Sequence, residues 1–274
     1  MLLSLLLACT AESITLPDSE GDLILQPYPA EVEGSRYFSQ FTTVFGVYIL
    51  ATDGVADDKL THAAHVMARY LDGDEDGIPE APQVVETMIA RKATLMMFAS
   101  QREARWSGVF RSDALDELHG QDLYDDETNE PGRFDASLEE VLHLITSAGW
   151  AHTWPAELGE SDGSELAAAM DTARGGHFTD IPDSYPAEAW YHYDDATCEY
   201  DCMVTEYVYW ALTSLLGAQS GRCEEIEQEW ELCTAAQVAQ TDAAVTALLT
   251  DGRFPLPTVL PDGSYAGQPA AEPE

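Results

Sequence analysis

The amino-acid sequence is poor in basic residues, and this scarcity excludes several kinds of partner. It holds 12 Lys and Arg against 50 Asp and Glu, which gives a formal net charge of −38. A surface with this charge repels nucleic acid and anionic lipid, so neither is expected to bind the folded chain. No stretch after the N-terminus is long and apolar enough to span a bilayer. The excess of acid suits a protein that lives in salt water or binds divalent cations.

Strand signals are also scarce, although the apolar content is that of a folded protein. The hydrophobic fraction is 45%, with 6 Trp and 12 Tyr, so we expect a hydrophobic core with the acidic residues on its surface. Residues 41–50, rich in β-branched and aromatic side chains, are the best strand candidate. Apolar periodicity predicts helices over residues 57–71, 82–99, 112–119, 138–147, 164–173, 203–218, 223–233 and 235–250. We therefore predict a mainly α fold (α+β with a minor sheet), with a single helical domain over 36–253.

The two ends of the chain differ from this body. Residues 1–9 form a short apolar stretch without Lys or Arg, and Leu6-Leu7-Ala8-Cys9 resembles a bacterial lipobox in which Cys9 is lipidated. Residues 10–35 are predicted to be a tether, and the proline-rich residues 254–274 a surface-hugging or loose tail. We expect an exported protein, either a lipoprotein of the outer membrane or cell surface that contacts membrane only through Cys9, or a secreted protein.

The other cysteines predict disulfides in the C-terminal half. Cys198, Cys202, Cys223 and Cys233 form an even set, which in an exported chain indicates two disulfides with three possible connectivities. A structural zinc site is the alternative, but the spacings C-x3-C and C-x9-C fit the usual zinc knuckles poorly.

A run of alternating carboxylates between the first two predicted helices indicates a calcium loop. Residues 72–80 read Asp-Gly-Asp-Glu-Asp-Gly-Ile-Pro-Glu, and Gly77 allows a sharp turn at the sixth position. The expected oxygen ligands of Ca²⁺ are Asp72, Asp74, Asp76, the carbonyl of Ile78, and Glu80. The run resembles EF-hand loops and, in its Gly-Ile-Pro-acid ending, the calcium loops of thrombospondin type 3 repeats. Gln83 replaces the EF-hand glutamate at position 12, and the sequence gives no sign of a hydrophobic groove that would open. We therefore expect a structural clip and not a sensor; an acidic, solvated turn is the alternative.

Two further predicted helices carry buried polar residues. Glu206 is the only charged side chain in the apolar run 203–216, and a buried carboxylate needs a metal ion, a histidine or an arginine as its partner. The helix over 138–147 carries Glu139, Glu140 and His143. Residues four apart share a helix face, so Glu139 and His143 can hold one metal ion.

This pattern resembles the zincin metallopeptidases, whose site helix carries H-E-x-x-H and whose later helix supplies a third ligand, often glutamate. The resemblance covers Ser137 to Gly217 and implies a metal-dependent hydrolase of peptide or protein substrates. It places Glu139 and His143 as the first two metal ligands, Glu206 as the third, and Glu140 as the general base. A carboxylate in place of the first histidine implies a harder site with a weaker preference for zinc over other divalent ions.

Two residues near this site are further candidates. His152 follows Gly149, where a glycine turn could bring the histidine back as a reserve ligand. Tyr200 ends an aromatic, acidic loop before the Glu206 helix, and zincins that stabilise an oxyanion with a phenol make it a candidate catalytic residue. Packing is the alternative role for this tyrosine.

A structural interpretation of the same helix stays open. Ser137 and Glu140 fit the S-x-x-E capping box, which would explain the carboxylates without chemistry and leave His143 as a hydrogen-bonded core residue. The protein would then be a noncatalytic, calcium-stabilised surface lipoprotein that serves binding or scaffolding. An enzyme with a serine or cysteine nucleophile is a third alternative with little support, and the cysteines are expected to be paired.

Overall fold

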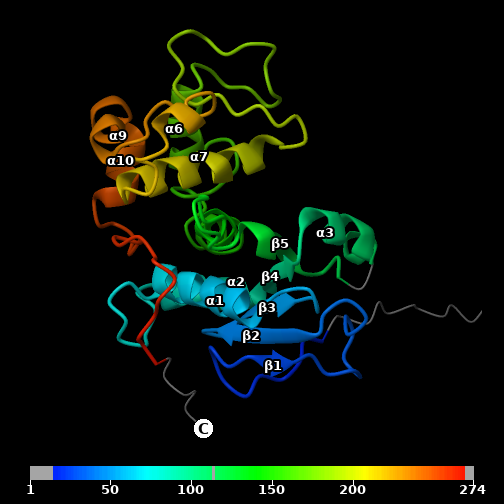
Figure 1. Ribbon diagram of the computed structural model, residues 1–274. Coiled ribbons are helices and arrows are strands. Elements are labelled where there is room, and N and C mark those ends of the chain that lie inside the picture. Colours follow the sequence, from blue (N-terminus) through cyan, green and yellow to red (C-terminus); the bar gives the residue numbers. More distant parts are fainter. Residues whose placement is uncertain (1–14, 113–114, 269–274) are drawn as a thin grey trace, which may run out of the picture.

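A mixed five-stranded sheet with helices on both faces forms the base of the molecule (Figure 1). The computed structural model describes residues 15–112 and 115–268. Its strands are β1 (Gln26–Pro27), β2 (Gln40–Val44), β3 (Val47–Ala51), β4 (Ala93–Phe98) and β5 (His119–Tyr124), and they lie in sequence order in the sheet. The pairs β1–β2 and β2–β3 are antiparallel, whereas β3–β4 and β4–β5 are parallel. The predicted combination of helices with a minor sheet is confirmed.

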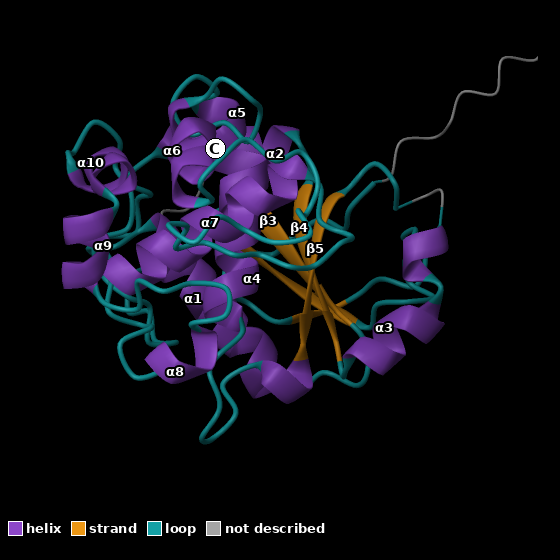
Figure 2. Ribbon diagram, turned by 90° about the horizontal axis from the view of Figure 1, so that it is seen from above, coloured by secondary structure: helices purple, strands orange, loops and turns teal. Residues whose placement is uncertain are grey.

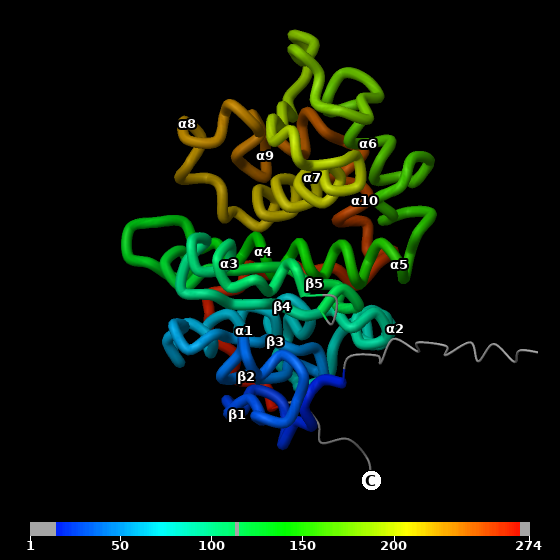
Figure 3. Tube along the Cα trace, turned by 90° about the vertical axis from the view of Figure 1, so that its right-hand side faces the viewer, coloured from blue at the N-terminus to red at the C-terminus, as the bar shows by residue number. Residues whose placement is uncertain are grey.

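Most of the helices form two layers on one side of the sheet. Their bounds are α1 (Asp57–Leu71), α2 (Pro82–Ala90), α3 (Gln101–Ser107), α4 (Ser137–Leu144), α5 (Ala151–Thr153), α6 (Glu165–Ala173), α7 (Tyr200–Leu215), α8 (Cys223–Ile226), α9 (Ala235–Thr241) and α10 (Ala243–Thr250). Two 3-10 turns, η1 (Val109–Arg111) and η2 (Asp125–Glu127), and a π-helical segment, η3 (Ile145–Trp150), complete the set. Seen from above, α1, α2 and α4 lie on one side of the strands and α3 on the other (Figure 2). Helices α6 to α10 form an upper layer over α4 (Figure 3).

Strand residues alternate between two hydrophobic cores, because successive side chains point to opposite faces of a sheet. Ile49 and Leu95 enter the larger core, which also contains α1, α2, α4 and α7. Leu50 and Met96 enter the smaller core beneath α3 and η1. Both faces of β4 are therefore covered, and every residue of that strand is buried.

This double burial explains where the helix prediction failed. The predicted helix over 82–99 is wrong beyond Ala90, because Lys92 has a φ of 54° and the chain then enters β4. A strand covered on both faces shows a continuous apolar run and no alternation, so it resembles a buried helix. The predicted strand over 41–50 is a hairpin of β2 and β3, and its turn uses the positive φ of Phe45 (50°) and Gly46 (81°).

Three other predicted helices also need correction. The helix over 112–119 is wrong, because residues 115–117 form a turn and β5 begins at His119. The helix over 223–233 is shorter than predicted and ends at Ile226. The helix over 235–250 is two helices, because the side chain of Asp242 accepts a hydrogen bond from the Val245 amide (3.1 Å) and starts α10 afresh.

Both ends of the described chain pack on the body. The tether predicted over 10–35 contains β1 and the buried Tyr28, so part of this range belongs to the fold. Cys9 and its lipobox lie outside the described residues. In the tail, Leu256 and Tyr265 are buried, which fits the surface-hugging form. Across residues 15–112 and 115–268, none of the helices has the length and apolarity that a membrane crossing requires.

Two disulfides fasten the segments around α7. Cys198 pairs with Cys202 and Cys223 with Cys233, with Cα–Cα distances of 5.4 and 5.2 Å. This sequential connectivity is one of the three that the sequence left open, and it excludes the zinc-knuckle alternative. Such bonds are typical of chains that fold in an oxidising compartment.

Candidate metal centre

Three of the predicted ligands meet where α7 crosses α4. Glu139 and His143 lie on one face of α4, and Glu206 faces them from α7. One ligand atom from each of these residues lies within 4.8 Å of the other two. The four-residue spacing along α4 brings Glu139 and His143 together. The packing of α7 on α4 then brings Glu206 to them (Figure 1).

The imidazole of His143 is held between two carboxylates. Its Nδ1 lies 3.4 Å from Oε2 of Glu140, and its Nε2 lies 3.3 Å from Oε2 of Glu206. The side chain is only 7% exposed, and its Nε2 is buried without a hydrogen bond of acceptable geometry. Leaving a buried polar atom unpaired costs about 1–3 kcal/mol, so a ligand at this nitrogen would remove that cost. A metal ion bound by Nε2 of His143 and by the carboxylates of Glu139 and Glu206 fits that position.

Tyrosine hydroxyls form hydrogen bonds with both Glu139 and Glu206. Tyr193 donates to Oε1 of Glu206 over 3.1 Å, and the hydroxyl of Tyr209 hydrogen-bonds to Glu139. The ring of Tyr209 also stands edge-on to His143, with 5.5 Å between ring centroids. Outer-shell groups of this kind fix the orientation of metal ligands in known sites.

Glu140 lies on the far side of His143 from this cluster. Its Oε2 accepts a hydrogen bond of 2.6 Å from Gln121 Nε2 in β5 and contacts Nδ1 of the imidazole. That position is typical of a carboxylate that orients a metal-bound histidine from behind. The geometry therefore favours a positioning role for Glu140 over the general-base role that the zincin resemblance implies.

Burial and mutual charge control protonation in the cluster. Burial raises the pKa of Glu139 to about 8, with His143 opposing the shift and Glu206 and Glu140 adding to it. Burial alone would lower the pKa of His143, but the carboxylates of Glu206 and Glu140 outweigh it and raise that pKa well above its ordinary value. Protons thus offset the charge of the metal-free cluster, and a bound cation would displace them.

The capping-box interpretation of α4 is wrong. Ser137 is the first helical residue, Ala136 occupies the cap position, and no side chain caps the helix there. The hydroxyl of Ser137 instead donates to Oδ1 of Asp135 over 2.7 Å, and that oxygen also accepts the Ser137 amide. The side chain of Glu140 therefore does not cap the helix. It contacts Gln121 and His143 instead.

Two predicted residues lie outside the cluster. His152 is exposed on α5, because the chain continues through Gly149 as the π-helical segment η3 instead of turning back. Tyr200 donates to Oδ1 of Asp171 over 3.1 Å, and so it faces α6. Of the aromatic loop before α7, it is Tyr193 that reaches the cluster.

Glu160 is a half-buried acid beside the site that the sequence did not indicate. The hydroxyl of Thr205, the residue before Glu206, donates to its Oε1. Burial raises the pKa of Glu160 to about 7, with the Thr205 hydrogen bond opposing the shift. Glu160 lies in an irregular segment between α5 and α6, where no periodicity separates a buried acid from an exposed one.

Glu160 gives a testable pH dependence. Its folded pKa exceeds the ordinary value of 4.5, so its favourable contribution is present at low pH and is lost as pH rises through about 7. Glu160→Gln, which stays neutral and keeps an acceptor for Thr205, is expected to be more stable than wild type at pH 8 by about 2 kcal/mol, after allowance for partial exposure. At pH 5, only just above the unfolded pKa of 4.5, the difference should be much smaller.

Urea denaturation in chelator at both pH values measures this difference, with the exposed Glu188→Gln as the control. A constant difference between Glu160→Gln and wild type at pH 5 and pH 8 would contradict the assignment.

A serine nucleophile has no support from the structure. Gly159 to Gly163 fits the pattern G-x-S-x-G, but Ser161 is exposed in a turn before α6 and does not follow a strand.

The predicted calcium loop joins α1 to α2 and brings part of its ligand set together. Oxygens of Asp72, Asp74 and Glu80 lie within 4.8 Å of one another. Asp76 is outside this group, and its Oδ1 accepts the Ile78 amide over 2.9 Å. The structure thus gathers three of the five predicted calcium ligands.

Comparison with known proteins adds no relative. No protein-family model matches the chain, and neither a curated protein nor a solved structure is similar to it. Function therefore has to be inferred from the site itself.

Proposed function

We propose that this protein is an exported metalloprotein that binds a divalent transition-metal ion through Glu139, His143 and Glu206 and hydrolyses peptide bonds there. The observation that carries the proposal is the buried Nε2 of His143, which lacks a hydrogen bond and faces two carboxylates. A divalent ion in such a site acts as a Lewis acid and makes water nucleophilic near neutral pH. Three protein ligands, which leave a coordination position open, are typical of catalytic sites.

The surrounding residues support a positioned set of ligands. Glu140 and Gln121 orient His143 from behind, and Tyr193 orients Glu206. With two carboxylates and one imidazole, the donor set suits zinc but also harder divalent ions such as manganese. A peptide remains the proposed substrate on the strength of the zincin resemblance of α4 and α7.

A noncatalytic, metal-stabilised protein for binding or scaffolding is the second candidate. The engagement of Glu140 by Gln121 and His143 favours it, because this removes the residue expected to act as general base. In that case the ion would join α4 to α7 and perform no chemistry.

Metal content and peptide cleavage in His143→Ala test the proposal. Wild type purified without chelators from an oxidising host is expected to hold about one zinc or manganese ion per chain, and His143→Ala less than about a tenth of that. The exposed His152→Ala is the matched control and should keep the wild-type metal content.

Cleavage of a mixed peptide library separates the two candidates. The hydrolase proposal expects cleavage by wild type and by His152→Ala, and none by His143→Ala. Metal binding without cleavage would support the scaffolding role. Equal metal content in wild type and His143→Ala would refute the site.

A further inference from the structure

The C-terminal segment 260–268 lies across the loop that joins α1 to α2. In Figure 1 the red end of the chain returns from α10, passes α1 and reaches the cyan loop that follows it. The buried Tyr265 donates its hydroxyl to Oδ2 of Asp72. The next residue, Ala266, donates its amide to Oε2 of Glu75 over 3.1 Å. Two consecutive residues of the tail therefore bind two acids of the predicted calcium loop.

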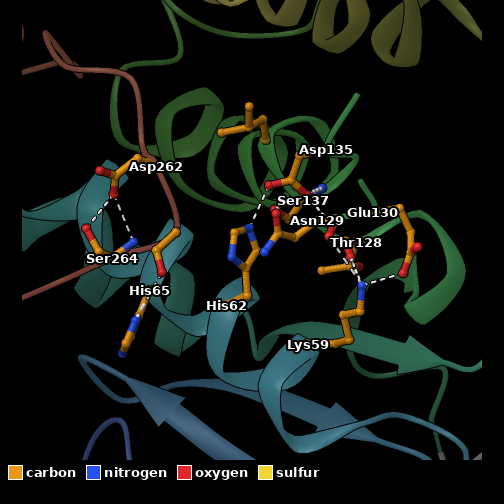
Figure 4. Close-up of polar contacts among 12 residues, drawn as sticks. Lys59, His62, His65, Thr128, Asn129, Glu130, Asp135, Ser137, Asp262 and Ser264 are labelled. Carbon is orange, nitrogen blue, oxygen red and sulfur yellow. Dashed lines mark hydrogen bonds and ion pairs between the residues drawn. The ribbon is translucent and has the colours of Figure 1, made fainter. Parts of the chain in front are cut away.

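Glycines allow the segment to approach this closely. Gly263 has a φ of +80°, and a Cβ there would collide with the His62 ring. Its carbonyl lies 3.2 Å from Nδ1 of His65, and Figure 4 shows His65 beside Asp262 and Ser264. At Gly267, a Cβ would lie 3.0 Å from the Glu75 carbonyl oxygen. The segment is thus fitted to α1 and to the loop.

Asp72 carries a buried oxygen without a hydrogen-bond partner. The residue is completely buried, and its Oδ2 accepts hydrogen bonds from the Gly77 amide (2.8 Å) and from Tyr265. Its other oxygen, Oδ1, is buried and has no hydrogen-bond partner. Oxygens of Asp74 and Glu80 lie within 4.8 Å of Asp72. An unpaired buried carboxylate oxygen is costly, and a cation held by the three acids would remove that cost.

We propose that the 72–80 loop and the C-terminal segment 260–268 form one unit that is closed by a calcium ion. Tyr265 holds the Asp72 oxygen that faces away from the ion and so aims Oδ1 at it, as outer-shell donors do in other metal sites. An all-oxygen set on an irregular loop suits Ca²⁺, whereas Mg²⁺ demands a nearly ideal octahedron. Binding of the ion and docking of the segment strengthen each other by the same factor.

Calorimetric titration of the chelator-treated full chain with Ca²⁺ tests this coupling. Wild type is expected to bind with a Kd of roughly 10⁻⁴ M or lower. Tyr265→Phe keeps the ring but removes the hydroxyl, and it is expected to weaken Ca²⁺ binding by about 10- to 100-fold. Tyr37→Phe, a tyrosine of the smaller core, is the matched control and should leave the affinity unchanged. The exposed Asp74→Asn should abolish binding without threatening the fold.

Hydrogen exchange of peptides covering 255–268 measures whether the C-terminal segment is docked. Ca²⁺ is expected to slow this exchange in wild type and in Tyr37→Phe, and to have no effect in Asp74→Asn. Equal affinities of wild type and Tyr265→Phe, or exchange that Ca²⁺ does not alter, would overturn the coupling. Absence of Ca²⁺ binding to wild type would overturn the whole proposal. Repeating the titration in His143→Ala keeps this result separate from the fate of the α4–α7 centre.

Discussion

The metal-free protein is expected to unfold roughly 10 °C below the zinc-loaded protein, and Glu206→Ala is expected to abolish this difference. An ion present at about 1,000 times its Kd stabilises the folded state by about 4 kcal/mol. For a chain of this size, each kcal/mol moves the Tm by about 2–4 °C. Because Glu206 brings α7 to the two ligands of α4, its removal leaves only one helix to hold the ion.

Circular dichroism melting of each variant with chelator and with Zn²⁺, at constant Ca²⁺, measures the shift. Each protein serves as its own reference, so any direct effect of a substitution on folding cancels. Glu188→Ala, which removes an exposed carboxylate, should retain the full shift. If Glu206→Ala also retained it, the stabilising ion would have to bind elsewhere.

Asp242→Ala is expected to destabilise the protein by about 4 kcal/mol, the largest effect that we predict for a residue outside the metal centre. Asp242 is 3% exposed and accepts hydrogen bonds from the Tyr207 hydroxyl (2.6 Å), the Trp190 indole (3.0 Å) and the Val245 amide (3.1 Å). The hydroxyl of Tyr207 and the indole of Trp190 would each be left unpaired at a cost of about 1–3 kcal/mol, and loss of the cap on the Val245 amide costs about 1 kcal/mol more.

Urea denaturation of Asp242→Ala measures this loss, with Asp251→Ala at the other end of α10 as the control. Asp251 is exposed and its side chain pairs with the exposed Arg253, so its removal should leave the free energy of unfolding nearly unchanged. A loss below about 1 kcal/mol for Asp242→Ala would show that these three hydrogen bonds contribute little to stability. Because Tyr207 follows Glu206 on α7, Asp242→Ala should also weaken metal binding.

The elements that were predicted well are those with one buried face. Helix α1 matches its predicted range, 57–71, because its apolar residues recur with the period of a helix packed on one side. Strand β4 has no such signature, since both of its faces are covered. The helix predicted over 235–250 was divided by Asp242, whose side chain caps the second half where the pattern alone showed continuity.

The candidate site was predictable only as far as local spacing reaches. The separation of four residues places Glu139 and His143 together, and the isolated charge of Glu206 indicated that it needed a partner. The choice of Tyr193 over Tyr200 depends on how the loop before α7 folds back, which spacing does not encode. Glu160 reaches Thr205 from a segment without periodic structure, so nothing in its neighbourhood distinguished it from the many surface acids.

The disulfides and the α4–α7 centre connect different parts of the fold. Cys198–Cys202 and Cys223–Cys233 each close a short loop within the upper layer, so neither ties that layer to the helices resting on the sheet. The three proposed ligands do span that boundary, with two from α4 and one from α7. An ion held there would act as a rivet between the layers, and a force pulling them apart would load the coordination bonds before it reached either disulfide.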